Sequence, residues 1–204
     1  MLNVAVLGST RGTDLQAIID AIESGKLKDV KISVVISNKK DAYILERAKK
    51  HNLESVFVDP KGKSREEFDK EVDKILEEKG IGLILLIGYM KIMSSEFVQK
   101  WLNKVMNIHP SLLPAYAGGM DLNVHEEVLK RGCKVSGCSL IFIDEGADTG
   151  PIIIQKVCEI ENDETADTLK AKVQKLEGEA LIEGIELFRD GKLKVKGKRV
   201  IVSK

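Results

Sequence analysis

The amino-acid sequence predicts an α/β fold with a doubly wound, mostly parallel sheet and helices on both faces. Short apolar runs alternate along the chain with segments of helical period, and this alternation is typical of such folds. The first runs are continuously apolar, as expected for strands buried on both faces of a parallel sheet. The length of 204 residues suits one domain with a well-buried core.

In the first half of the chain, strand and helix patterns follow each other closely. Apolar residues spaced three and four apart predict each helix, and Ser64 with Glu67 forms a capping-box pattern at the start of one of them. That helix is expected to bury Phe68, Val72, Ile75 and Leu76. The expected strands are 2–7, 30–36, 55–58, 82–88 and 105–107, and the expected helices are 13–25, 42–51, 64–76 and 95–101.

The second half is less regular. A helix at 123–130 precedes two neighbouring strands, at 135–143 and 152–160, which an acidic loop at 144–150 separates. A long helix runs from Ala166 to Phe188 and stops at Gly191, because glycine commonly follows a helix end. A short strand pair at 193–195 and 199–202 closes the chain. We find no repeat or linker, so a single domain over residues 1–204 is expected.

Composition limits the classes of partner. Lys plus Arg and Asp plus Glu each number 32, so the net charge is zero, which disfavours a nucleic-acid partner. The apolar runs are too short to span a bilayer, and no signal-peptide pattern is present. Three cysteines without Cys-x-x-Cys spacing fit a reducing compartment and buried small side chains. We therefore expect a soluble, cytoplasmic protein with small-molecule partners and no membrane partner, either a monomer or a homodimer.

The segment from Gly8 to Asp14 predicts an anion site. It places glycines, hydroxyls and a cation between a strand and a helix N-terminus, where free backbone N–H groups favour a phosphate or a carboxylate. It matches neither the dinucleotide-binding glycine motif nor a P-loop. The alternative is an ordinary turn that Thr13 or Asp14 caps.

A second group of residues predicts acyl-transfer chemistry. Asn107 and His109 lie two positions apart at a strand end, so both side chains project from the same side. An amide donor beside an imidazole can bind a developing oxyanion and handle protons, as acyl transfer to an amine requires. A carboxylate from the acidic loop near His109 would favour the protonated ring and orient it. The alternatives are a core histidine and a solvated hairpin loop.

Other chemistries have weaker support. No Gly-x-Ser-x-Gly elbow occurs, and Ser111 follows His109 too closely to be assumed its partner, so direct transfer is favoured over a covalent intermediate. The three histidines are scattered, so no metal is expected. The segments at 8–14, 88–93, 107–114 and 144–150 all follow strands and are expected to converge at one site, beyond the carboxyl ends of the sheet strands.

These motifs resemble a known family. Asn107 to Pro114 (NIHPSLLP) and Gly146 to Ile152 (GADTGPI) are similar to the paired signatures of the 10-formyltetrahydrofolate-dependent formyltransferases. The segments at 15–19 and 88–93 resemble the branch that acts on glycinamide ribonucleotide in purine biosynthesis. The resemblance covers essentially the whole chain and implies the formyltransferase fold.

The resemblance implies direct transfer of a formyl group from 10-formyltetrahydrofolate, the co-substrate, to the amine of glycinamide ribonucleotide. Asn107 and protonated His109 would stabilise the tetrahedral intermediate, while Asp148 would hold His109 cationic and relay protons. The implied nucleotide half is about 1–105 and the folate and catalytic half about 106–204. The implied nucleotide-binding residues are Gly12, Thr13, Asp14, Gly88 and Glu177. The implied folate-binding residues are Arg65, Met90, Lys91, Ile92, Met93, Asn107, Asp144, Glu145, Gly146, Ala147 and Asp148.

The sequence departs from the family pattern at three places. Asp14 stands where many relatives carry Asn, and a carboxylate there would repel a phosphate unless Arg11 compensates. Ile141 stands where relatives often carry His. The loop at 118–122 is longer than in familiar bacterial members, which leaves the role of His125 open.

Two other functions remain possible on the same core. One is a formyltetrahydrofolate hydrolase or another formyltransferase, although the chain has no room for the additional domains that such relatives usually carry. The other is a non-catalytic folate or nucleotide sensor, against which the intact set of Asn107, His109 and Asp148 argues.

Overall fold

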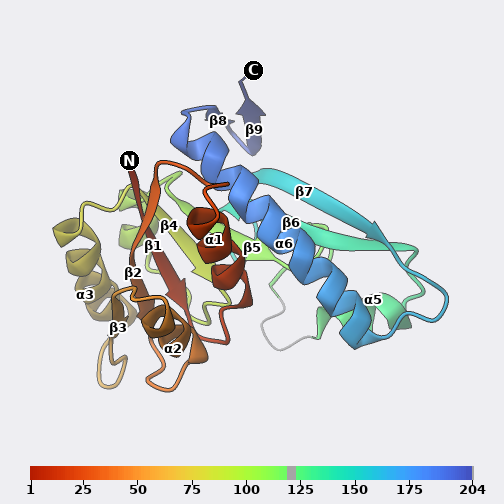
Figure 1. Ribbon diagram of the computed structural model, residues 1–204, viewed down its shortest axis with the longest axis horizontal. Coiled ribbons are helices and arrows are strands. Elements are labelled where there is room, and N and C mark those ends of the chain that lie inside the picture. The colour runs from red at the N-terminus through yellow and green to blue at the C-terminus, as the bar shows by residue number, and fades with distance from the viewer. Residues whose placement is uncertain (119–122, 204) are drawn as a thin grey trace.

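The protein, described here from a computed structural model over residues 1–118 and 123–203, has a nine-stranded sheet in its described part (Figure 1). The strands are ordered β3-β2-β1-β4-β5-β6-β7-β9-β8 across the sheet. The strands are β1 (Leu2–Gly8), β2 (Val30–Ser37), β3 (Ser55–Phe57), β4 (Leu83–Ile87), β5 (Val105–His109), β6 (Val135–Phe142), β7 (Ile152–Glu159), β8 (Leu193–Lys196) and β9 (Arg199–Val202). The helices are α1 (Thr13–Glu23), α2 (Tyr43–Lys50), α3 (Arg65–Glu78), α4 (Ser95–Lys100), α5 (Val124–Lys130) and α6 (Ala166–Arg189).

The first five strands form the parallel, doubly wound part of the sheet. Strand β1 lies between β2 and β4, and β4 pairs with β5, all in parallel register. Strand order reverses at β1 and β4, because the chain first builds outward to β3 and then returns to add β4. In such sheets, ligands bind beyond the carboxyl ends of the strands at the reversal. The predicted fold class is therefore confirmed.

The remaining strands run in mixed directions. Strand β6 is antiparallel to both β5 and β7, and the short β8–β9 hairpin joins the edge of β7 through one parallel pairing, Ile152 with Arg199. The two strands that the sequence placed on either side of the acidic loop are thus neighbours, as predicted. Because β5 and β6 are antiparallel, the carboxyl end of β6 lies near the amino end of β5. Strand direction alone therefore does not place the acidic loop after β6 beside the loop after β5.

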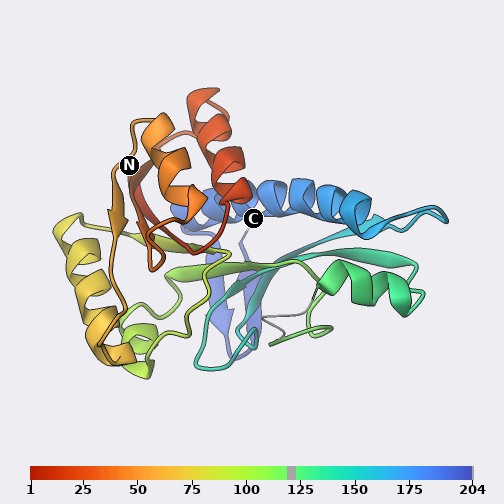
Figure 2. The same ribbon diagram turned by 90° about the horizontal axis from the view of Figure 1, so that it is seen from below.

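Two hydrophobic cores cover the two faces of the sheet. Apolar residues of α1, α2, α5 and α6 pack together on one face, and those of α3 and α4 pack on the other. Figure 2 shows α1 and α2 on one side of the sheet and α4 on the opposite side. No helix among the described residues has the length and apolarity needed to cross a membrane.

The helix boundaries follow the sequence signals closely. The capping box at the start of α3 is present, with the Ser64 hydroxyl accepting from the Glu67 N–H and the Glu67 carboxylate accepting from the Ser64 N–H. Phe68, Val72 and Leu76 are buried as expected, but Ile75 is only partly buried, because it lies at the margin of the helix face that meets the sheet.

Candidate active site

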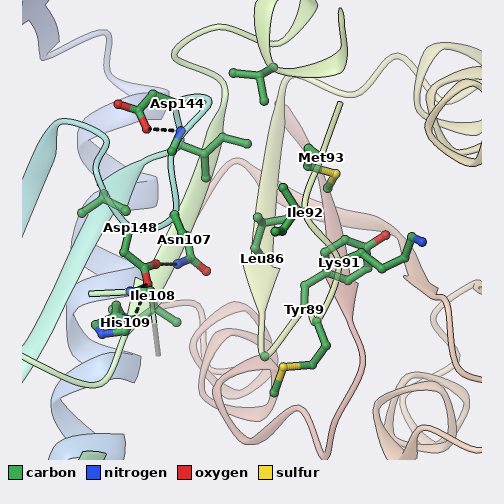
Figure 3. Close-up of a pocket in the computed structure, with 18 of the residues that line it drawn as sticks. Leu86, Tyr89, Lys91, Ile92, Met93, Asn107, Ile108, His109, Asp144 and Asp148 are labelled. Atoms are coloured by element: carbon green, nitrogen blue, oxygen red, sulfur yellow. Dashed lines mark hydrogen bonds and ion pairs between the residues drawn. The ribbon is translucent and has the colours of Figure 1, made fainter. Parts of the chain in front are cut away.

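A cavity of about 350 Å³ opens at the ends of β4 and β5. Three of the four segments that the sequence expected to converge contribute to its wall (Figure 3). The fourth, at 8–14, meets the cavity at its rim, where the Ser9 N–H donates to the Gly88 carbonyl at 3.1 Å. The lining residues are Leu86, Gly88 to Met93, Val98, Asn107 to Pro110, Gly118, Val124, Ile141, Ile143 and Asp144 to Asp148.

Asn107, His109 and Asp148 form a connected polar network on one wall of the cavity. The Asn107 amide Nδ2 donates to Asp148 Oδ1 at 3.2 Å, and His109 Nδ1 lies 3.3 Å from Asp148 Oδ2 (Figure 3). Asn107 and His109 reach the same carboxylate because alternate residues of β5 share one face of the sheet. The histidine and aspartate side chains are only 9% and 18% exposed, so water screens this interaction weakly.

The His109 ring lies between two oxygen atoms. Besides the Asp148 carboxylate at Nδ1, the Tyr116 carbonyl oxygen lies 3.2 Å from Nε2. Both ring nitrogens therefore lie near oxygen atoms, and the contact at Nε2 has hydrogen-bond geometry. Such a ring can stabilise negative charge and can also release a proton.

The acidic loop combines turn chemistry with a site role. Asp144 Oδ1 accepts from the Gly146 N–H at 3.1 Å and from the Thr149 hydroxyl at 2.6 Å, as in a self-supporting turn. These hydrogen bonds and that of Lys198 lower the pKa of Asp144, although its partial burial opposes them. Asp148 has φ of 56°, an uncommon conformation for a non-glycine residue that aims its carboxylate into the cavity.

The N-terminus of α1 is open to an anion. Gly12 is the N-cap residue with φ of 64°, and no described side chain caps the helix. The proposed alternative, a cap from Thr13 or Asp14, is therefore wrong. Gly12 is required for space as well as conformation, because a Cβ atom there would lie 2.4 Å from the Ile44 side chain. The amide groups of the first helical turn remain available to a phosphate.

Two acidic side chains lie close together between α1 and α6. Burial raises the pKa of Asp14 to about 6. Burial, followed by repulsion from Asp14, raises the pKa of Glu177 well above its usual value. Asp14 Oδ1 is buried without a hydrogen-bond partner among the described residues. The adjacent acids disfavour simultaneous ionisation and therefore tend to retain a proton between them.

The sequence-predicted folate residues differ in their placement. Met90, Lys91, Ile92 and Met93 line the cavity, as does the backbone from Asp144 to Asp148. Arg65, by contrast, is exposed at the first position of α3 and is absent from the described cavity wall. The Lys91 ammonium lies over the Phe68 ring, 4.5 Å from its centroid.

The departures from the family pattern also have defined places. Ile141 lines the cavity and adds an apolar surface to it. His125 is buried on α5, and burial lowers its pKa, helped by the charge of Lys170. Residues 119–122 of the long loop lie outside the described residues.

The sequence did not predict the side chains that support the site residues through hydrogen bonds. The Ser139 hydroxyl accepts from the Leu113 N–H at 3.0 Å and donates to the Ser111 carbonyl at 2.7 Å, which fixes the segment after His109. Lys198, in the turn between β8 and β9, contacts Asp144 Oδ2 at 2.7 Å. A serine inside an apolar strand is only a weak sequence signal of such a supporting role. A lysine near the end of the chain gives no such signal.

The cysteines and metal candidates give no competing site. Burial raises the pKa of the Cys138 thiol to about 12, with Glu177 as the next cause, so this thiol is unreactive at neutral pH. Cys133 and Cys158 are partly buried and all three cysteines are free. The described residues contain no group of three or more metal-ligating side chains.

Comparison with known proteins adds independent observations. Residues 2–185 match the family model described as formyl transferase. The chain is 38% identical over 197 residues to phosphoribosylglycinamide formyltransferase of Haemophilus influenzae, covering 96% of this chain and 91% of the relative. It is also 38% identical over 189 residues to the human trifunctional purine biosynthetic protein adenosine-3, covering 92% of this chain. The chain spans only 18% of that human protein.

A solved structure extends the similarity to three dimensions. The crystal structure of glycinamide ribonucleotide transformylase 1 from Symbiobacterium toebii superposes with a TM-score of 0.93 at 36% sequence identity. The match covers 100% of this chain and 95% of that one.

Proposed function

The chain belongs to the formyl transferase family, and we propose that it transfers the formyl group of 10-formyltetrahydrofolate to the amine of glycinamide ribonucleotide in purine biosynthesis. The observation that carries this proposal is the network of Asn107, His109 and Asp148 on the wall of a cavity large enough for a folate ring system. The network offers what direct acyl transfer needs, namely donors for an oxyanion and a group that moves protons.

In the proposed reaction, the substrate amine attacks the formyl carbon and a new carbon–nitrogen bond forms. The formyl oxygen becomes an oxyanion, toward which the second amide hydrogen of Asn107 and the His109 ring donate. In the free protein, the Tyr116 carbonyl oxygen is the hydrogen-bond partner of His109 Nε2. In the reaction, the oxyanion replaces this oxygen as the acceptor. The bond from the formyl carbon to N10 of the folate then breaks. The amine loses one proton and N10 gains one, with His109 and Asp148 as the relay.

The nucleotide half, about residues 1–105, supplies the phosphate site. We assign the phosphate to the uncapped N-terminus of α1, with Gly12 and Thr13 contributing backbone N–H groups. Glu177, Asp14 and Gly88 then line the path between the phosphate and the cavity. Arg11 is exposed beside this terminus, and its positive charge offsets the negative charge of Asp14 toward a phosphate.

The folate and catalytic half, about residues 106–204, completes the donor site against the segment at 89–93. The walls of the cavity are largely aliphatic, from Met90, Ile92, Met93, Ile141 and Ile143. Such walls hold a ring system by apolar contact and backbone hydrogen bonds rather than by aromatic stacking. We propose that the reaction needs no metal. Both this point and the cytoplasmic location of the protein stay predictions.

An absorbance assay of formyl transfer from 10-formylfolate, with and without glycinamide ribonucleotide, tests the proposal. Turnover that depends on the nucleotide is the expected result. Consumption of the donor without the nucleotide would assign the protein as a hydrolase. Binding of donor or nucleotide without turnover would assign it as a sensor.

A further inference from the structure

The segment from Gly88 to Ser94 forms one wall of the cavity but belongs to no helix or strand. It connects β4 to α4, and six consecutive residues, 88 to 93, line the cavity. An irregular segment that must present a fixed surface to a ligand needs support from neighbouring elements, since it lacks a hydrogen-bond ladder of its own.

Both ends of this segment are held by side chains from other elements. At the first end, the Met90 N–H donates to the Ser9 hydroxyl at 2.9 Å. At the other end, the Ser94 N–H donates to Asp69 Oδ2 at 2.6 Å. Ser94 then caps α4, because its own hydroxyl accepts from the Phe97 N–H at 3.3 Å. Asp69 therefore fixes the point at which the cavity wall becomes a helix.

Asp69 is unusual among the acidic residues of α3. It is only 3% exposed, and its Oδ1 atom is buried without a partner among the described residues. The Tyr89 hydroxyl is also buried and unpartnered in the described part of the chain. Burial raises the pKa of Tyr89, and the charge of Asp69 raises it further.

The middle of the segment also rests on α3. The Lys91 ammonium lies over the ring of Phe68, the residue next to Asp69. Burial raises the pKa of Asp69, and the hydrogen bonding of Ser94 and then the charge of Lys91 oppose this only in part. Figure 3 shows the Tyr89 and Lys91 side chains extending together to the same side of the segment. Phe68 and Asp69, which are adjacent on α3, thus contact Lys91 in the cavity wall and Ser94 at the end of the segment.

We propose that Asp69 is a positioning residue for the formyl donor, which holds the segment at 88–94 against α3 through the Ser94 N–H. The inference rests on the proposed function, because it assigns the donor to this wall. A hydrogen bond to a buried carboxylate is stronger than one to a neutral acceptor, so Asp69 holds the Ser94 end of the segment firmly.

Three variants separate positioning from general stability. Asp69→Ala removes both acceptors, whereas Asp69→Asn keeps an acceptor for the Ser94 N–H. Asp73→Ala is the matched control, since Asp73 lies one turn further along α3 and accepts from Trp101 Nε1 at 2.8 Å without contacting the segment. Steady-state kinetics of each folded variant gives the donor KM, the nucleotide KM and kcat.

For Asp69→Ala we expect the donor KM to rise about tenfold and the nucleotide KM to change less than about twofold. Asp69→Asn should restore most of the donor KM. Asp73→Ala should lower the melting temperature and leave the donor KM unchanged. Equal donor KM values in Asp69→Ala and Asp73→Ala would overturn the proposal.

Hydrogen exchange of the ligand-free protein gives a readout that does not depend on the proposed reaction. The Ser94 amide should exchange at least about tenfold faster in Asp69→Ala than in wild type, and at the wild-type rate in Asp73→Ala. Unchanged exchange in Asp69→Ala would overturn the anchoring. Faster exchange in a protein that neither binds nor uses the formyl donor would retain the anchor, reject its role toward the donor, and reject the proposed function.

Discussion

The catalytic cavity and the N-terminus of α1 differ in how their polar groups are satisfied. In the cavity, Asp148 accepts from Asn107 through one oxygen and from the Gly118 N–H, at 3.0 Å, through the other, which also faces His109. At α1, the first-turn amides lack a side-chain cap and one oxygen of Asp14 is buried without a partner among the described residues. The polar side chains of the first region thus meet partners within the protein, whereas those of the second do not among the described residues.

This difference follows from what each region has to do. Groups that stabilise a transition state act best when they are already oriented, because no reorganisation is then needed during the reaction. A phosphate site instead needs donors that no protein group already occupies. A buried polar group without a hydrogen-bond partner lowers the stability of the folded protein. We therefore expect the N-terminus of α1, and not the catalytic cavity, to be the destabilised region of the free protein.

The largest effects should come from breaking the complete network. Asn107→Ala, His109→Ala and Asp148→Ala should each lower kcat by at least about 100-fold, as electrostatic and acid–base groups usually do. Steady-state kinetics gives the measurement, and circular dichroism checks that each variant folds. A rate like that of wild type in any of them would remove that residue from the mechanism.

A second prediction addresses the strain at α1. Because the pKa of Asp14 is raised from 3.8 to about 6, the folded state binds this proton more tightly than the unfolded state. Stability therefore falls as the pH rises from about 4 to about 6. Asp14→Asn should be more stable than wild type at pH 7 by on the order of 1–3 kcal/mol, and the difference should vanish below about pH 4.

Urea unfolding at the two pH values measures this effect. Asp20→Asn, an exposed position on the same helix, is the matched control and should show no such change. If Asp14→Asn is no more stable than wild type at pH 7, the buried carboxyl is not strained.

The third prediction concerns the charge at the open helix terminus. Arg11→Ala should raise the KM for the nucleotide by roughly three- to tenfold while changing the donor KM much less, because an exposed charge near a phosphate contributes about 1 kcal/mol. Lys26→Ala, beyond the other end of α1, is the control. An equal effect of Arg11→Ala on both substrates would separate Arg11 from the phosphate.

The smallest effect is expected at the edge of the cavity. Lys198 joins the β8–β9 turn to Asp144 Oδ2 and to the Thr149 carbonyl, both at 2.7 Å. Its side chain is 70% exposed, so this ion pair contributes only about 0–1 kcal/mol. Lys198→Met should raise the donor KM about twofold at low salt and not at high salt. Lys196→Met in the same hairpin should have no effect, and a salt-independent change in Lys198→Met would argue against an ionic cause.

The order and type of the elements were largely predictable, because local patterns determine them. Continuous apolar runs gave β1 and β4, and helical spacing gave α6 over most of its length. The adjacency of Asn107 and His109 was also predictable, since a strand places alternate residues on one face. Arg65 shows where this reasoning stops, because its distance from the cavity depends on how α3 packs.

The sequence by itself determined the fold class, the elements and the residue types of the site, because these follow from periodicity and side-chain chemistry within short segments. Only the tertiary structure decided which partners these residues meet. The Tyr116 carbonyl at His109, the repulsion between Asp14 and Glu177 and the contact of Asp69 with Ser94 all join distant or irregular segments. Such contacts depend on the packing of whole elements, which no local pattern encodes.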